Sequence, residues 1–325
     1  MAVSPRHRGK CLGGIGAAVA GVGIGYGAPW LASDLQLLLW PLLAVMLFGR
    51  FSRMSAADLA PARAGRRFLA ALAITHALVI PALVGLLLLP LQGPATTLHV
   101  TLAVLLLAPC TDRVVAYTNR GHGSAQQVTA AAPLVLLAQL PGVAVGVTLL
   151  LGPDVLAGLA LDEIAVGLAT VVLMPLGLAL ALDALPGAVP LTERLRRTGR
   201  RTAYPVLLAV LAIAGAHHGP QAAEAWPQLL VAAGVATGFL LMAPLAGWAV
   251  GRLCRLGAAG ARSLVYSSGA RNGIVILPVA LLLPEPGVAL GVLLVHGVIE
   301  IALMVGWTRI GPGLVPLQPE SGKRG

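Results

Sequence analysis

Apolar runs of about 20 residues recur from one end of this chain to the other, and each is long enough for a helix to cross a hydrocarbon core of roughly 30 Å. Hydrophobic residues make up 58% of the 325 residues and charged residues only 10%, and the mean hydropathy is +0.89. So little polar surface cannot coat a soluble protein of this length. The sequence therefore predicts a single all-α integral-membrane domain over residues 1–325.

The apolar runs divide into about ten expected transmembrane helices. Their predicted ranges are 12–31, 35–49, 68–90, 95–118, 124–151, 164–184, 203–217, 225–253, 261–284 and 286–308. Ten helices form two sets of five, and because five is odd, the second set must enter the membrane from the opposite side. We therefore expect two inverted repeats, over about 12–151 and 164–308, with short tails at 1–11 and 309–325. Inverted repeats are common in secondary transporters, which bind solutes near the bilayer midplane.

The basic residues predict the orientation of these helices. The net charge is +10, and Lys and Arg concentrate at the two termini and in alternate loops, at residues 50–67, 119–123, 185–202 and 252–262. The intervening loops contain neither Lys nor Arg. Because basic residues near helix ends resist translocation, this distribution predicts a multi-pass protein of the bacterial cytoplasmic (inner) membrane with both termini in the cytoplasm. It does not favour a nucleic-acid partner.

The fourth expected helix contains ionisable residues directly after a proline. Its sequence runs Ala108-Pro109-Cys110-Thr111-Asp112-Arg113. Proline interrupts the helical hydrogen bonds, and such a break is tolerated at membrane depth only beside protein or a water-filled cavity. Charged residues in a span each cost roughly 2.5–3.5 kcal/mol, so Asp112 and Arg113 are candidate functional residues.

The ninth expected helix is the counterpart of the fourth in the second repeat. Two serines and two glycines flank Arg271 and Asn272 and loosen the helix around them. Arg271 lies deeper in its expected span than Arg113 does, so reaching the membrane surface explains it less well, and we expect it to pair with Asp112 or Glu300. In the tenth helix, His296 and Glu300 are four residues apart and share a face, which suits a proton relay or a cation site.

Other features indicate structure rather than chemistry. Gly21-x-x-x-Gly25 and Gly23-x-x-x-Gly27 allow close helix packing in the first span. The isolated polar residues His76, His99 and Gln139 are interpreted as structural, and His217 and His218 as loop residues.

The three cysteines, Cys11, Cys110 and Cys254, lack the paired spacing of a disulfide framework or zinc site. No phosphate-binding, dinucleotide-binding or hydrolase motif is found, so we expect no cofactor and no enzyme activity.

The segment Leu106–Asp112, read as LLAPCTD, resembles the arsenite permeases of the bile acid/sodium symporter superfamily. Gly269–Asn272 and Val298–Glu300 are similar to the carboxyl-terminal part of the same family, and the likeness extends from about Leu35 to Pro316. This resemblance implies that helices 4 and 9 are discontinuous and cross in a core domain that moves against a panel domain. It also implies arsenite or antimonite export, with Cys110, Asn272 and Glu300 in the functional positions.

One departure from the family pattern concerns the ninth helix. Gly273-Ile274-Val275-Ile276 stands where these arsenite permeases usually place an acidic residue after the asparagine. The missing acid argues against a two-sodium coupling site of the kind found in the bile acid branch.

Three functional hypotheses follow, and each gives the polar residues a different role. The first is proton-coupled arsenite export, in which Cys110 binds arsenic(III) as substrate beside Thr111, Asp112 and Asn272. The second is a sodium- or proton-coupled organic anion carrier in which Arg113 and Arg271 hold the anion. The third is a membrane-embedded enzyme with Asp112 and Glu300 as acid and base. The first two need a small-molecule substrate, a coupling H⁺ or Na⁺ and the lipid bilayer.

Overall fold

The computed structural model describes residues 5–53, 64–91, 96–111, 113–184 and 190–315. Over these residues every regular element is a helix, and one isolated β-bridge joins two extended segments. The helices bury a continuous core of Leu, Val, Ala and Phe side chains, while many large apolar side chains remain exposed on the outside. An apolar exterior of this kind matches a lipid environment.

The first part of the chain forms the helices α1 to α8. Their bounds are α1 (Pro5–Gly27), α2 (Pro29–Gln36), α3 (Leu39–Phe51), α4 (Arg66–Ile74), the π-helical η3 (Thr75–Val79), α5 (Ile80–Leu88), α6 (Thr97–Leu107), α7 (Arg113–Arg120) and α8 (Ala125–Leu151).

The second part of the chain continues from α9 to α16. The bounds are α9 (Pro153–Ala157), α10 (Leu161–Leu168), the π-helical η4 (Ala169–Leu173), α11 (Met174–Ala184), α12 (Pro190–Glu224), α13 (Trp226–Leu253), α14 (Ala258–Gly269), α15 (Gly273–Ala280) and α16 (Pro286–Leu314).

Several helices have the length and composition of membrane spans. Among the described residues, five continuous helical segments meet both criteria, and seven do if each of two bent pairs counts as one span. One bent pair is α2 with α3, which meet at 57°. The shorter helix α6 is also apolar. The chain is therefore a multi-pass, all-α membrane protein, and the division into ten spans and two inverted repeats stays a prediction.

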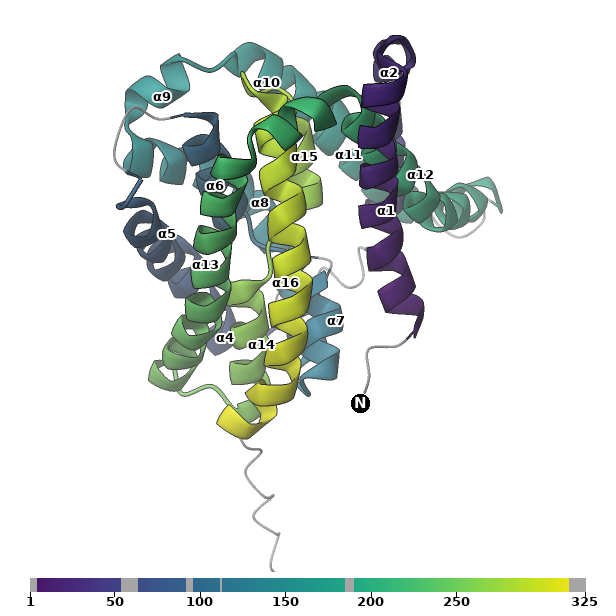
Figure 1. Ribbon diagram of the computed structural model, residues 1–325. Coiled ribbons are helices and arrows are strands. Elements are labelled where there is room, and N and C mark those ends of the chain that lie inside the picture. Colours follow the sequence, from purple (N-terminus) through teal and green to yellow (C-terminus); the bar gives the residue numbers. More distant parts are fainter. Residues whose placement is uncertain (1–4, 54–63, 92–95, 112, 185–189, 316–325) are drawn as a thin grey trace, which may run out of the picture.

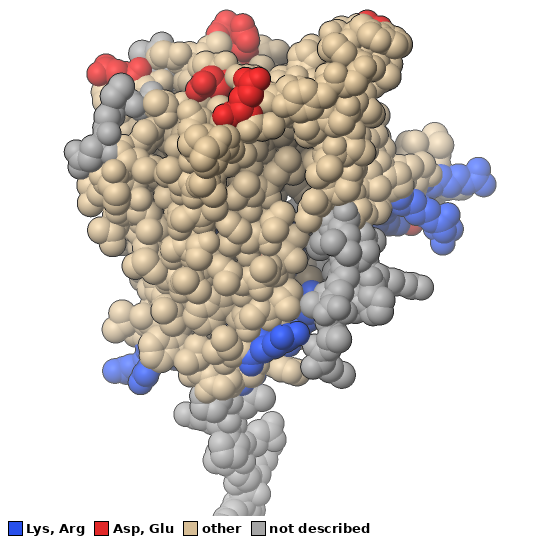
Figure 2. All heavy atoms as spheres, viewed as in Figure 1, with Lys and Arg blue, Asp and Glu red and all other residues tan. Residues whose placement is uncertain are grey.

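The helices gather into two groups that meet along α12 and α16 (Figure 1). In one group, α12 packs against α1 and α3. In the other, α13 packs against α14 and α16, with α6 and α8 behind them. Figure 2 shows acidic side chains at the end of the molecule where α9 and α10 lie, and basic side chains toward the opposite end. This separation is what a membrane protein with one basic face presents.

The long helix α12 corrects two of the sequence-based boundaries. The segments 185–202 and 218–224 were expected to be loops, but the chain is helical from Pro190 to Glu224. Arginine is a good helix former, so a basic run does not end a helix. Two ion pairs hold this end of α12: Arg196 pairs with Asp183, and Arg200 Nη2 lies 2.7 Å from Glu193 Oε1.

The two glycine motifs of α1 have different surroundings. Gly21 and Gly25 lie against the backbone of α12, where a Cβ atom would collide with the carbonyl oxygens of Ala212 and Ala216. A Cβ at Gly23 or Gly27 would have no described atom within 4 Å. The expected close packing therefore holds for Gly21 and Gly25 only, and it was wrong for the other motif.

This difference predicts opposite effects of one methyl group on the same helix. Gly21→Ala should destabilise the protein by about 1–3 kcal/mol, because α1 must move away from α12. Gly23→Ala should leave stability unchanged or raise it by up to about 1 kcal/mol through helix propensity. Denaturant unfolding of both purified variants measures the difference, and equal effects would contradict the packing described here.

Candidate functional site

Two broken helices cross in the group of helices that contains α13 and α16. Helix α6 ends at Leu107 and α7 begins at Arg113, while α14 ends at Gly269 and α15 begins at Gly273. The chain is extended at Ala108, with φ −85° and ψ 101°, and at Ala270, with φ −67° and ψ 135°. Pro109 contributes to the first break because it has no backbone N–H to continue the helix.

The two extended segments satisfy one another's backbone groups. They run antiparallel and form the bridge between Pro109 and Arg271. The Cys110 N–H donates to the Ala270 carbonyl at 3.3 Å, and the Asn272 N–H donates to the Ala108 carbonyl at 3.1 Å. Each break thus supplies hydrogen-bond partners that a single broken helix would lack in a membrane.

Glu300 of α16 lies against this crossing and is fully buried. Its Oε2 atom is 3.2 Å from Arg113 Nη2 and 3.4 Å from the Arg271 backbone nitrogen. His296 Nδ1 is 3.7 Å from the same oxygen. Arg113 Nη2 also donates to the Arg271 carbonyl at 2.9 Å, so this one arginine joins α7, the second break and α16.

The Arg271 guanidinium occupies a different place from the one expected. Its side chain is fully buried, Nη2 donates to the Ser268 carbonyl, and Cζ lies 4.7 Å from the centre of the Phe239 ring. The ion pair to Glu300 is made by Arg113, and the hydrogen bond that Arg271 donates to that carboxylate comes from its backbone N–H. The other expected partner, Asp112, lies outside the described residues.

Cys110 lies on the side of the crossing that faces α4 and α8. It is 3% exposed, and the Arg113 N–H donates to its Sγ at 3.3 Å. With Thr111 and Ser267 it borders a pocket of about 10 Å³, which is the space of a single water molecule. The thiol is therefore beside the break, as the sequence predicts, but it does not open onto a large cavity.

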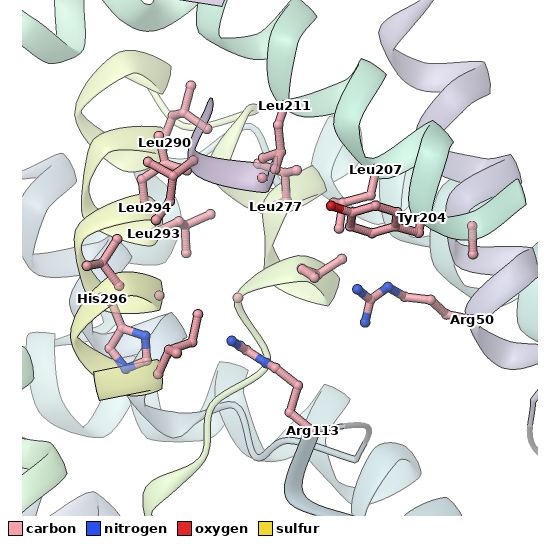
Figure 3. A pocket seen from close by; sticks show the side chains of 18 of the residues that line it. Arg50, Arg113, Tyr204, Leu207, Leu211, Leu277, Leu290, Leu293, Leu294 and His296 are labelled. Atoms are coloured by element: carbon pink, nitrogen blue, oxygen red, sulfur yellow. The ribbon is translucent and has the colours of Figure 1, made fainter. Parts of the chain in front are cut away.

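A larger cavity of about 300 Å³ lies between the two helix groups, next to the crossing (Figure 3). Leu207 and Leu211 of α12 face Leu290, Leu293 and Leu294 of α16 across it. The polar side chains on its wall are Arg50, Arg53, Arg113, Tyr204 and His296. Among the described residues that line it, none is acidic.

Of these polar residues, the sequence predicts only Arg113 and His296 as part of the site. It predicts Arg50 and Arg53 in the basic cytoplasmic loop and gives no role to Tyr204. Figure 3 shows Arg50 pointing into the cavity with Tyr204 beside it. A basic residue at the end of a span is the only sequence signal here, and it does not distinguish an arginine that faces inward from one that faces solvent.

Several outlying polar residues have local structural contacts. His99 Nδ1 accepts from Thr96 Oγ1 at 2.8 Å, and its Nε2 donates to the Leu91 carbonyl at 2.6 Å. His76 lies 3.3 Å from Ser267 Oγ. His217 and His218 stack edge to face within α12 rather than in a loop. The Gln139 side chain lies outside the described residues. No three His, Cys, Asp or Glu side chains gather into a metal-binding group in the described part of the chain.

The ion pair between Arg113 and Glu300 predicts a large loss of stability when Arg113 is replaced, and a partial recovery when Glu300 is also neutralised. Arg113→Met should destabilise the protein by about 3–5 kcal/mol, because it leaves a buried carboxylate without its ion-pair partner. Adding Glu300→Gln should restore much of that loss, and a double mutant no more stable than Arg113→Met would contradict the pairing. Glu193→Gln removes an exposed pair and serves as the control, with an expected effect below about 1 kcal/mol.

The sequence as a whole matches no family model, and no characterised protein matches it significantly.

Proposed function

We propose that this protein is a secondary transporter for a small organic anion with an apolar body, which binds in the cavity between α12 and α16. The observation that carries this proposal is the composition of the cavity wall. Most of the residues that line it are apolar, six of them leucines, and arginines supply its charged groups. A mostly apolar cavity of about 300 Å³ with a few convergent polar groups is typical of a small-molecule site.

The charged side chains on the described cavity wall favour an anion. Arg50, Arg53 and Arg113 border the cavity, and Arg271 lies behind it at the crossing. No Asp or Glu stands among the described residues that line the cavity. Guanidinium groups bind carboxylates through paired hydrogen bonds, so such a wall suits an anionic solute.

Glu300 offers a route for coupling transport to protons. Its carboxylate and the solute anion would compete for Arg113, which both lines the cavity and contacts Glu300 Oε2. Protonation of Glu300 would weaken its hold on Arg113 and make the guanidinium available to the solute. Proton binding and anion binding would then favour one another, which is what a proton-coupled carrier requires.

The location of the cavity suits alternating access. It lies where the group containing α1 and α12 meets the group containing α15 and α16. Relative movement of two helix groups around a site near broken helices is a common mechanism of secondary transporters.

The anion proposal is tested with a pair of ligands that differ only in charge. The purified protein should bind 4-phenylbutyrate at least tenfold more tightly than the neutral 4-phenylbutyramide, as measured by calorimetry or ligand-induced thermal shift. Arg53→Gln should weaken phenylbutyrate binding by about tenfold or more, the usual effect of losing a charged hydrogen bond.

Two comparison variants make this experiment specific. Leu207→Trp should abolish binding by filling the cavity, whereas Leu253→Trp, on a residue 82% exposed at the end of α13, should have no effect. Equal affinity for the acid and the amide would contradict the proposal.

Arsenite export is the second candidate, and the position of Cys110 supports it. The thiol lies at the first break, where it borders a small pocket together with Thr111 and Ser267. The resemblance to arsenite permeases implies that this cysteine is needed for transport. Arsenic(III) prefers a soft sulfur donor to hydroxyl or carbonyl oxygens. A single thiol ligand would also release arsenic(III) more readily than three thiol ligands would. In this alternative the small pocket would have to open during transport.

The thiol hypothesis predicts a selective loss of resistance. Cys110→Ser should abolish arsenite resistance in an arsenic-sensitive bacterial host while the amount of protein in the membrane stays unchanged. Cys11→Ser and Cys254→Ser are the matched controls and should retain resistance. Full resistance with all three variants would exclude a thiol-dependent arsenite carrier and favour the organic anion.

A further inference from the structure

The crossing brings together two helix ends that favour a positive charge. Helices α6 and α14 both terminate there, at Leu107 and Gly269. The carboxyl end of a helix carries a partial negative charge from its last carbonyl groups. In transporters built from broken helices, such ends and the unwound carbonyls beside them commonly bind the coupling cation.

In this protein a side chain places its own charge at that position. Arg271 follows the end of α14 by two residues, and its Nη2 donates to the Ser268 carbonyl in the last turn of that helix. The guanidinium carbon lies 4.7 Å from the Phe239 ring, whose negative face attracts cations. The guanidinium of Arg271 thus lies between the end of α14 and helix α13, which carries Phe239.

Two ordinary explanations for an intramembrane arginine do not fit Arg271. It does not reach the membrane surface, because its side chain is fully buried. Nor is its guanidinium the ion-pair partner of Glu300, which contacts Arg113 instead. Within the described part of the chain, Nε and Nη1 of Arg271 have no hydrogen-bond partner. The described contacts of the guanidinium are a helix end and an aromatic ring, which also attract free cations, and Glu300 adds an attraction over a longer distance.

We propose that Arg271 is a tethered cation: its guanidinium occupies the position of a metal cation at the crossing, so that the protein needs no bound sodium there. A covalently attached charge keeps the end of α14 neutralised at every stage of a transport cycle, without binding or releasing an ion. This role does not depend on which solute is carried.

The test removes the tethered charge and offers free cations in its place. Purified wild type, Arg271→Ala and Arg271→Lys are melted in sodium, potassium, choline and low-millimolar guanidinium chloride at matched ionic strength. Arg271→Ala should melt at a lower temperature than wild type. Guanidinium or sodium should recover at least half of that difference, and choline should recover none. Wild type and Arg271→Lys should show no cation-specific shift.

The control variant removes another arginine that lies over an aromatic ring. Arg252 is 5.1 Å from the centre of the Trp248 ring at the end of α13, away from the crossing. Arg252→Ala should show no cation-specific recovery.

Either of two results would overturn the tethered-cation proposal. One is an Arg271→Ala protein whose melting is the same in all four salts, and the other is a wild type that sodium stabilises specifically. If Arg271→Ala does not fold in any salt, Arg271→Lys decides: a folded protein supports the role of charge, and an unfolded one contradicts it. These readouts involve no solute, so their failure would leave the proposed anion binding untouched.

Discussion

The rest of the structure depends on two extended segments that satisfy each other's backbone groups inside a helical membrane protein. Each unsatisfied backbone group in a lipid environment costs several kcal/mol, so one broken helix alone would be unfavourable. The pairing of Ala108 with Asn272 and of Cys110 with Ala270 removes that penalty for both breaks at once. The crossing in turn creates a polar centre, and the buried carboxylate of Glu300 and the two arginines beside it gather around that centre.

The two arginines at the crossing occupy distinct environments, although both bear the same charge. Arg113 is partly exposed to the cavity and shares its guanidinium between Glu300 and the second break. Arg271 is enclosed by the end of α14 and by Phe239. The first environment suits a group that exchanges partners during transport, and the second suits a permanent charge. An apolar cavity with arginines on its wall lies beside this centre, and in the proposed function the body of the solute would meet its leucines and the charge its arginines.

The sequence predicts the membrane class and the two breaks because these depend on local composition. Long apolar runs define the membrane helices, and Pro109 and the glycines around Arg271 weaken the helix where the structure is extended. The partners within the site depend on how helices rotate against one another, which a single sequence does not record. Gly21 and Gly23 belong to equivalent motifs, yet only Gly21 faces α12. For the same reason, the sequence did not show that Arg113 meets Glu300 or that Arg50 and Tyr204 border the cavity.

In the proposed function, the solute anion binds beside the crossing of two broken helices. A structure of the protein in lipid nanodiscs with bound 4-(4-iodophenyl)butyrate tests it most directly, because the iodine marks the position of the apolar end. We expect the carboxylate at Arg53 and Arg113 and the iodophenyl ring between Leu207 and Leu293, with the chain extended at residues 108–111 and 270–272. Continuous helices through these segments, or a ligand bound anywhere else, would contradict the account.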